Sequence, residues 1–334
     1  THALEAVTAA QPAIAQQDDS DFALVRGQQQ AKRAMEIAAA GGHNVLLVGP
    51  PGSGKTLLAR SMPSILPPLS YAEALEVTAI HSVGGTLHSE TPLQLRRPFR
   101  TPHHTTSTAA LVGGGSIPKP GEVSLAHYGV LYLDELPEFP RQALEALRQP
   151  LEDGMVTVAR AAQSLRFPAQ CMLVASQNPC PCGYRNDPKR ACACSPAQLL
   201  RYQRRVSGPL LDRIDLHIQV PRQDFATLRL DGKLAENSAS IRDRVVQARA
   251  TQEQRFAQHH NRTNAHMSQA LLTKYCQVDA ASQALLRQAV DQLHLSARGY
   301  VRVLKVSRTI ADLAGSEGIL LAHVAEALQY RSQG

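Results

Sequence analysis

Gly49-Pro50-Pro51-Gly52-Ser53-Gly54-Lys55-Thr56 is the stretch that decides the fold, because it fits the pattern GxxxxGK[ST] of a phosphate-binding loop. The apolar run Val45-Leu46-Leu47-Val48 precedes it and Leu57-Leu58-Ala59 follows it. We therefore expect a buried strand, a glycine-rich loop and a helix, which Pro63 is expected to break. In such a loop backbone N–H groups surround phosphate oxygens, the lysine reaches the β and γ phosphates, and the last hydroxyl ligates Mg²⁺. A tight turn without a ligand is the alternative, but the flanking strand and helix favour a nucleotide triphosphate. The residues predicted to bind it are Gly49, Pro50, Pro51, Gly52, Ser53, Gly54, Lys55, Thr56 and Leu57.

Two carboxylates follow a second apolar run further along the chain. Gly129-Val130-Leu131-Tyr132-Leu133 is typical of a core strand, and Asp134 and Glu135 come directly after it. Because the carboxyl ends of parallel strands emerge at one edge of a sheet, Asp134 is expected beside the Mg²⁺ held by Thr56, and Glu135 beside the γ-phosphate. Two acids at a strand end are commonly a solvated turn. The upstream phosphate loop favours a catalytic role, with Glu135 as the base that polarises the attacking water.

A third buried strand is expected over residues 171–176, with Asn178 just beyond its end. The Asn178 amide can donate to the γ-phosphate or to the attacking water. ATP and Mg²⁺ are therefore the predicted cofactors, with Thr56 and Asp134 as the magnesium ligands. The catalytic residues predicted from this reasoning are Lys55, Asp134, Glu135 and Asn178.

Four of the six cysteines lie close together, at Cys180, Cys182, Cys192 and Cys194. Zinc sites usually show CxxC pairs, so two CxC pairs with nine residues between them are a less common arrangement. Four thiolates within one short loop are nevertheless enough to close a tetrahedral structural zinc site. The alternative is four reduced thiols on a loop.

Composition and charge narrow the class of protein. The chain has 334 residues and a formal net charge of +7, which favours a polyanionic partner, although nucleotide binding also recruits Arg and Lys. No apolar run approaches the roughly 18 residues of a membrane span, and residues 1–15 lack the features of a signal peptide. We expect a cytoplasmic protein with no membrane association. Because the sequence begins at Thr1, we also expect a piece of a longer protein that lacks an N-terminal region.

Three regions are expected along the chain. Residues 1–20 are typical of a linker remnant, residues 21–222 of an α/β core, and residues 223–334 of a helical domain. Inside the core, residues 155–168 are a candidate hairpin. Residues 196–205 are a candidate helix with three arginines on one face, either a solvated surface or a polyanion contact. The helices expected in the last region cover residues 238–256, 267–276, 280–293, 296–314 and 319–331.

The order of these motifs resembles that of AAA+ ATPases in the magnesium-chelatase and minichromosome-maintenance helicase branch. The set comprises the phosphate loop, Leu133-Asp134-Glu135, Asn178, Leu211-Asp212-Arg213 and Ser296-Ala297-Arg298-Gly299. From about residue 20 to the end, longer strings are similar to the ComM (YifB) family in particular. These strings are Gly42-His43-Asn44, Phe99-Arg100-Thr101-Pro102-His103-His104, Asn178-Pro179-Cys180-Pro181-Cys182-Gly183-Tyr184 and Ser207-Gly208-Pro209-Leu210-Leu211-Asp212-Arg213-Ile214-Asp215.

The resemblance implies an AAA+ core, with a parallel sheet sandwiched by helices, followed by an all-α lid. It implies a hexameric ring with ATP at the subunit interfaces, acting as a branch-migration helicase during natural transformation. Arg213 matches the arginine finger that reaches a neighbour's γ-phosphate, and Arg298 matches the sensor-2 arginine, acting in cis or in trans. Residues 105–125 match the helix-2 insert, and the strands about Arg160 match the pre-sensor-1 hairpin. Because both elements face the pore in related rings, Lys119 and Arg160 are the predicted DNA contacts.

Two features of the chain differ from what the relatives carry. The family has an N-terminal Lon-protease-like domain, and its absence from this sequence agrees with the expected truncation. The four-cysteine loop of residues 180–194 is not found in chelatase subunits.

Three functional hypotheses remain open at this point. The first is an ATP-driven DNA motor, the second a chelatase-type ATPase that remodels a protein or a metal-insertion partner, and the third a slow nucleotide-dependent scaffold. Aromatic residues make up 4% of the chain, with no Trp, so single-stranded or branched DNA would be held by its backbone, without sequence preference. DNA-stimulated ATPase activity separates the first hypothesis from the other two.

Overall fold

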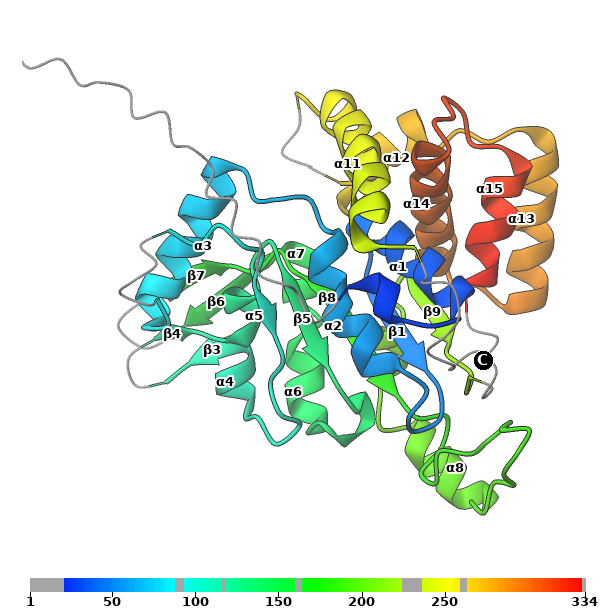
Figure 1. Cartoon of the computed structure of the whole chain (residues 1–334), viewed down its shortest axis with the longest axis horizontal. Helices are drawn as coiled ribbons and strands as arrows, with labels where there is room; N and C mark the ends of the chain where they lie inside the picture. The colour runs from blue at the N-terminus through cyan, green and yellow to red at the C-terminus, as the bar shows by residue number, and fades with distance from the viewer. Residues whose placement is uncertain are drawn as a thin grey trace, which may run out of the picture.

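The computed structural model describes residues 21–87, 93–115, 118–159, 164–223, 236–258 and 263–331. Within these residues the main sheet has five parallel strands in the order β2-β5-β8-β1-β9, with helices on both faces (Figure 1). The last part of the described chain is helical. The predicted α/β fold class is confirmed. The strands of the main sheet are β1 (Val45–Val48), β2 (Phe99–Arg100), β5 (Val130–Leu133), β8 (Met172–Gln177) and β9 (Leu216–Gln219).

The central strands are apolar on both faces because helices cover both faces. Alternate residues of β1 and β5 enter two separate cores: Val45 and Val130 pack in the first, Leu46 and Leu131 in the second. In the register, Val45 pairs with Val174 of β8, and Leu131 pairs with Leu173. Since all these pairings are parallel, the carboxyl ends of β1, β5 and β8 lie at one edge of the sheet.

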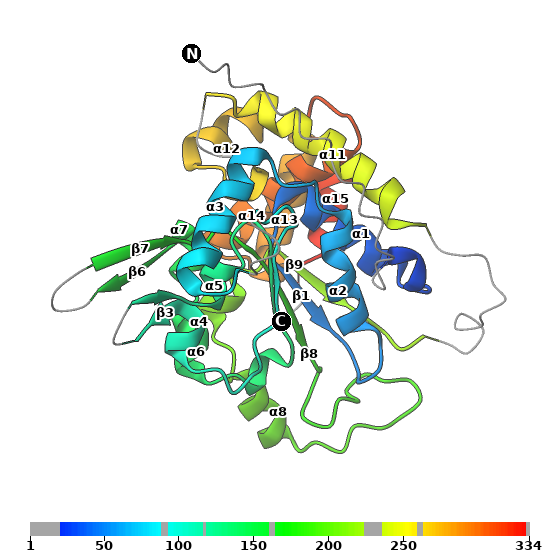
Figure 2. The same ribbon diagram turned by 60° about the vertical axis from the view of Figure 1, so that its left-hand side comes forward.

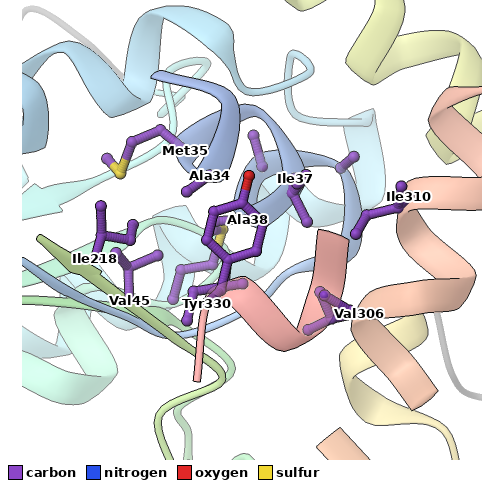
Figure 3. Close-up of a cluster of buried hydrophobic side chains, with 14 of the residues drawn as sticks. Ala34, Met35, Ile37, Ala38, Val45, Ile218, Val306, Ile310 and Tyr330 are labelled. Carbon is purple, nitrogen blue, oxygen red and sulfur yellow. The ribbon is translucent and has the colours of Figure 1, made fainter. Parts of the chain in front are cut away.

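The first core joins the sheet to the helices on one of its faces. Figure 3 shows α1 (Gln29–Gly41) between the strands and α14 (Ala297–Leu313), with Ile37 and Ala38 facing the buried cluster. Tyr330, just after the last helix, enters the same cluster. The C-terminal helices therefore share a hydrophobic core with the sheet. These helices are α11 (Ser238–Arg255), α12 (Gln269–Tyr275), α13 (Ala280–Leu293), α14 and α15 (Leu321–Gln329), with the short turn η3 (Asn264–His266).

The helix after the phosphate loop is longer than the sequence predicts. Pro63 was expected to break it, but α2 (Lys55–Ile65) continues through Pro63 to Ile65. Met62 and Ile65 are fully buried on either side of the proline, so packing of this turn against the core outweighs the missing N–H of one residue. The chain then enters α3 (Tyr71–Gly84), whose first turn has a capping box between Ser70 and Glu73.

Smaller elements extend from the other side of the sheet. The predicted hairpin is confirmed as β6 (Met155–Ala159) paired antiparallel with β7 (Ser164–Pro168), and it extends away from the sheet (Figure 2). A second ribbon, β3 (Gly113–Gly114) with β4 (Lys119–Pro120), lies in the expected insert. Residues 1–20, the tip of the hairpin and residues 224–235 lie outside the described residues. The remaining short elements are η1 (Phe22–Leu24), α4 (Thr108–Val112), α5 (Glu122–Leu125), η2 (Leu136–Glu138), α6 (Arg141–Ala146), α7 (Pro150–Asp153), α8 (Pro196–Gln203) and α9 (Gly208–Leu211).

A buried charge also ties the sheet to α14. The Asp215 carboxylate, 2% exposed, accepts a hydrogen bond of 2.9 Å from the Asn44 backbone N–H and forms an ion pair with Arg302. Burial opposes ionisation of Asp215, but Arg302 and His43 outweigh it and hold the pKa of this carboxyl well below its usual range. Asp215 is therefore ionised in the folded protein, and Arg302 is its counter-ion on α14.

Acid is expected to destabilise the contact between the sheet and the C-terminal helices through His217 on β9. Burial and the nearby Arg331 lower the pKa of His217 to about 4, whereas an unfolded histidine titrates near pH 6.5. The folded state thus resists protonation, so this contribution to stability is complete above about pH 6.5 and is lost as the pH falls towards 4. We expect the free energy of unfolding to fall by about 3 kcal/mol over this range because of His217. Urea unfolding at several pH values should show that the free energy of unfolding depends less on pH in His217→Gln than in His294→Gln. His294 is the control because it is exposed.

Candidate functional site

The phosphate loop connects β1 to α2 and is open on the side where a ligand would lie. Gly52 and Gly54 have positive φ angles of 73° and 94°, and a Cβ atom on either would meet nothing within 4 Å. Gly49 differs, because a Cβ there would lie 2.1 Å from the Val220 carbonyl oxygen. Gln28 ties the loop to the segment after β9. Its Nε2 donates hydrogen bonds to the carbonyl oxygens of Ser53, at 3.1 Å, and Pro221, at 2.7 Å.

Several features of this loop fit a bound phosphate. The Ser53 hydroxyl oxygen is buried and has no hydrogen-bond partner among the described residues. Lys55 lies across the loop, where Nζ donates to the Gly49 carbonyl at 2.7 Å and to the Pro50 carbonyl at 2.9 Å. Burial lowers the pKa of Lys55, while Asp134 and Glu135 partly oppose this effect. The N-terminus of the eleven-residue α2 adds unpaired N–H groups to the same place.

The magnesium ligands predicted from the sequence face each other at the sheet edge. Thr56 Oγ1 lies 3.4 Å from Asp134 Oδ2. Ser176 at the end of β8 donates a hydrogen bond to Asp134, and the Tyr132 hydroxyl lies 3.4 Å from Thr56 Oγ1 and 3.3 Å from Ser176 Oγ. A hydroxyl and a carboxylate at one point are oxygen donors of the kind that Mg²⁺ prefers. Tyr132 and Ser176, which orient these ligands, were not predicted from the sequence.

Glu135 follows Asp134 in a backbone conformation that is unusual for a residue other than glycine. Its φ is 55°, and its N–H lies 3.1 Å from Asp134 Oδ1 and 3.3 Å from Ser176 Oγ. The side chain is exposed, and its carboxylate has no hydrogen bond or ion pair within the described part of the chain. The carboxylate is therefore available to a ligand.

Asn178 completes the set on the third strand. Lys55 Nζ donates to Asn178 Oδ1 at 3.3 Å, and the Tyr202 hydroxyl donates to the Asn178 carbonyl at 3.2 Å. Burial raises the pKa of Tyr202 to about 12, so the phenol keeps the proton that it donates. The structure thus brings Lys55 and Thr56, at the start of α2, together with Asp134 and Asn178, which directly follow β5 and β8.

Two arginines of the predicted site do not join this group within the subunit. Arg213, only 7% exposed, forms an ion pair with Glu152 and donates to the Arg148 carbonyl at 3.0 Å and the Pro209 carbonyl at 2.8 Å. Arg298 is exposed in the first turn of α14 and forms no ion pair with the described residues. Neither guanidinium completes the catalytic group of its own chain.

The four clustered cysteines converge on one point. The distances from Cys180 Sγ to Cys182 Sγ and Cys192 Sγ are 3.4 and 3.7 Å, and all four sulfur atoms, including that of Cys194, lie within 4.8 Å of one another. A tetrahedral zinc ion with four thiolates places its sulfur atoms about 3.8 Å apart. Hydrogen bonds from the backbone of Tyr184 and Ala193 lower the pKa of the Cys182 thiol to about 6. The donor set therefore fits a zinc ion, and no disulfide joins these residues.

Basic residues gather in a second place, beside α8. A cavity of about 620 Å³ lies between α8 and the segment that follows Glu135. Arg205 in its wall pairs with Glu138 at 2.6 Å, whereas Arg201 and Arg204 form no ion pair with described residues. Of the two predicted DNA contacts, Lys119 is exposed on β4 and Arg160 lies outside the described residues. The residues lining the cavity are Pro137, Glu138, Phe139, Arg141, Ala197, Leu200, Arg201, Arg204 and Arg205.

Among the described residues, no helix is long and apolar enough to span a lipid bilayer.

Family models match most of the chain. The model of magnesium chelatase, subunit ChlI, matches residues 21–228, and that of the ChlI C-terminal region matches residues 235–331. Together they include the phosphate loop, Asp134, Asn178, Arg213 and Arg298.

Individual relatives agree with these models. The competence protein ComM of Haemophilus influenzae is 47% identical over 93% of this chain, and YifB of Escherichia coli is 45% identical over 93%. In each comparison the chain spans 60% of the relative's own length. The magnesium-chelatase 38 kDa subunit of Cereibacter sphaeroides is 28% identical over 47% of this chain and 52% of its own length.

Proposed function

Because the chain belongs to the magnesium-chelatase-like AAA+ ATPases of the ComM (YifB) family, we propose that it hydrolyses ATP as the motor part of a ring-shaped branch-migration helicase. The observation that carries this proposal is the convergence of Lys55, Thr56, Asp134 and Asn178 at one sheet edge. These side chains, with Glu135 beside them, supply the parts that phosphoryl transfer to water requires.

In the proposed reaction, the chain binds and orients ATP rather than forming a covalent bond with it. The loop N–H groups and Lys55 hold the phosphates, and Thr56 and Asp134 would hold Mg²⁺, which neutralises charge on the phosphate oxygens when bound. Asn178 orients the attacking water or the γ-phosphate, and the free Glu135 carboxylate accepts the proton of that water. Tyr132 and Ser176 keep Asp134 and Thr56 in place.

The ring itself is a further part of the proposal. Neither Arg213 nor Arg298 completes the site of its own subunit, which is what a site shared between neighbouring subunits requires. We take Arg213 as the finger supplied in trans and the ring as a hexamer. ATP turnover then depends on assembly, because an arginine finger contributes about 10³ to 10⁵ in rate in related systems.

DNA is the proposed substrate of the motor. The net charge of +7, the exposed Lys119 on β4, and the exposed Arg201 and Arg204 at the end of α8 support a polyanionic partner. The name of the Haemophilus relative, competence protein ComM, indicates a role in competence. Lys119 and Arg160 would contact single-stranded or branched DNA through its phosphates, independently of sequence. We propose that the protein acts in this way in the cytoplasm, in recombination during natural transformation.

A structural zinc ion is the last part of the proposal. The four sulfur atoms of residues 180–194 lie at distances close to those of a tetrahedral thiolate site. Metal analysis should find about one equivalent of zinc in the wild type and none in Cys182→Ser/Cys192→Ser.

The alternative function is that of a chelatase-type ATPase which remodels a protein or a metal-insertion partner. The 28% identity to a magnesium-chelatase subunit favours it. ATP-dependent displacement of a labelled strand from a branched DNA decides between the two. We expect displacement by the wild type and none by Glu135→Gln, together with ATPase activity that DNA stimulates. ATPase activity without DNA stimulation or displacement would support the chelatase-type alternative.

Arg201 on α8 and Arg204 at its C-cap give a sharper prediction about DNA. Arg201→Glu/Arg204→Glu is expected to weaken binding to single-stranded DNA by about 10-fold and to reduce the slope of log affinity against log salt by about 1. The reason is that both guanidiniums lack an acidic partner in the described structure and are available to phosphates. Fluorescence anisotropy at several salt concentrations measures both quantities.

The control variant for this experiment is Arg242→Glu/Arg287→Glu, on α11 and α13. Both control arginines are exposed, and the variant changes the net charge by the same amount. Equal loss of affinity in the two variants would mean that the effect comes from the overall charge and not from a contact between these arginines and DNA. Loss of the ring in the α8 variant alone would assign these arginines to a subunit interface instead.

A further inference from the structure

The loop of residues 180–194 has almost no hydrophobic core of its own. Within residues 180–194 only Cys180 and Gly183 are buried, and no disulfide crosslinks the segment. Apolar burial therefore cannot fix its conformation. The convergence of the four sulfur atoms within 4.8 Å leaves a bound metal as the crosslink that can hold it.

The first half of this loop packs directly against the phosphate loop. The turn from Cys180 to Gly183 is closed by a hydrogen bond of 2.9 Å from the Gly183 N–H to the Cys180 carbonyl. Gly183 has a φ of 83°, and a Cβ there would lie 2.6 Å from Pro51 Cδ and 3.9 Å from the Asn178 side chain. The turn of the four-cysteine loop thus lies directly against Pro51 of the phosphate loop, with the Asn178 side chain close by.

The second half of the loop leads to the same catalytic residue. Cys194 is followed by Ser195, which caps α8 by accepting a hydrogen bond of 3.3 Å from the Gln198 N–H. On the last turn of α8, the Tyr202 hydroxyl donates to the Asn178 carbonyl at 3.2 Å. Residues 192–194 therefore lead directly into the helix that carries this hydrogen bond.

From these contacts we infer that the four-cysteine loop is a metal-dependent support for the nucleotide site, in which Gly183 positions Pro51 and Tyr202 positions Asn178. The inference rests on the ATPase activity and the zinc site proposed above. Asn178 Oδ1 also accepts a hydrogen bond from Lys55 Nζ at 3.3 Å. A displacement of the four-cysteine loop that moves Asn178 therefore also moves the lysine that binds phosphate. Metal occupancy therefore sets both the affinity for nucleotide and the rate of turnover.

The first test changes the metal. Cys192→Ser/Cys194→Ser leaves the Cys180 turn chemically intact but removes half of the ligands. We expect loss of zinc, a 10- to 100-fold lower kcat and at least 10-fold weaker binding of a fluorescent ATP analogue, the range found when supporting residues of a site are removed. The thermal unfolding profile reports whether the rest of the fold is kept. A folded, zinc-free variant with wild-type nucleotide affinity and turnover would overturn the inference, as would a wild type that takes up no metal.

The second test keeps the metal and changes the contacts. Gly183→Ala places a Cβ against Pro51, whereas Gly315→Ala adds the same strain at a φ of 64° with nothing within 4 Å. We expect zinc to be retained in both and nucleotide affinity to fall about 10-fold in Gly183→Ala alone. Equal behaviour of the two variants would mean that the Pro51 contact does not position the loop.

A pair of tyrosine variants tests the other contact. Tyr202→Phe removes the hydroxyl that donates to the Asn178 carbonyl. Tyr184→Phe is the matched control, because the Tyr184 hydroxyl forms no hydrogen bond with described residues. We expect Tyr202→Phe to lower kcat about 10-fold with little change in KM, because Asn178 acts on the water or the γ-phosphate. An unchanged kcat in Tyr202→Phe would mean that Tyr202 does not position Asn178.

These outcomes are separable from failure of the proposed function. A wild type that binds nucleotide in a zinc-dependent manner but neither hydrolyses ATP nor displaces DNA would refute the motor and leave the support standing. A wild type that hydrolyses ATP equally well with and without zinc, with Mg²⁺ present in both cases, would refute the support and leave the proposed ATPase activity standing.

Discussion

Replacement of Glu135 by glutamine is expected to lower kcat for ATP hydrolysis by about 10² to 10⁴ while nucleotide affinity stays near that of the wild type. The Glu135 carboxylate is exposed at the end of β5 and engages no hydrogen-bond donor among the described residues. Glutamine has the same shape but cannot accept the proton of the attacking water. The hydrogen bonds made by the backbone N–H of this residue to Asp134 and Ser176 do not depend on the side chain, so the magnesium ligands should stay in place.

Two measurements check this expectation. ATP turnover and binding of a fluorescent nucleotide are compared for wild type, Glu135→Gln and Glu138→Gln. The last is a control three residues away, where the exposed carboxylate pairs with Arg205 instead of facing the phosphate loop. Turnover near the wild-type rate in Glu135→Gln would exclude Glu135 as the base.

Replacement of Arg213 by alanine is expected to lower turnover by about 10³ or more without preventing nucleotide binding. The reason is that Arg213 would stabilise charge on the γ-phosphate of a neighbouring subunit. In the single subunit the guanidinium is buried against Glu152 and two carbonyl groups, so it must leave these partners to reach a neighbour. Under the proposed function, this exchange would make assembly a condition for ATP turnover.

Mixing experiments decide whether the arginine acts in trans. Rings that combine Arg213→Ala with Lys55→Ala subunits should regain part of the activity, because the second variant keeps its arginine and the first keeps its phosphate loop. Glu152→Gln is the structural control, since it removes the ion pair of Arg213 and leaves the guanidinium available. We expect it to retain turnover. An absence of rescue in mixed rings, with both variants folded, would argue against action in trans.

Sequence patterns were sufficient to predict the fold and to predict that Thr56 and Asp134 lie together at one edge of the sheet. The apolar runs of β1, β5 and β8 are short and continuous because helices cover both faces of the sheet, and this signal survives in the sequence. The loop pattern before α2 and the carboxylates after β5 then locate the site, because parallel strands deliver their ends to one edge. The five C-terminal helices follow from periodicity in the same way.

The supporting contacts could not be predicted, because they join residues far apart in the chain whose types are not distinctive. Tyr132 is a core residue by pattern, and only the fold shows its hydroxyl between Thr56 and Ser176. Likewise, Glu152 is one exposed acid among many until the fold places it against Arg213. Pro63 is an error of a different kind, because its local preference yields to the packing of the neighbouring buried residues.

The order of the strands in the sheet has a consequence for how proteins of this fold can diversify. The β6–β7 hairpin lies between β5 and β8 in the chain, and the four-cysteine loop between β8 and β9, so both are connections rather than parts of the sheet. A connection can be lengthened, shortened or exchanged while the register of β1, β5 and β8 is preserved. The fold is in this sense modular. If the proposed function is right, chimeras that exchange the β6–β7 hairpin for the matching segment of a relative should keep ATP turnover and change only the response to DNA.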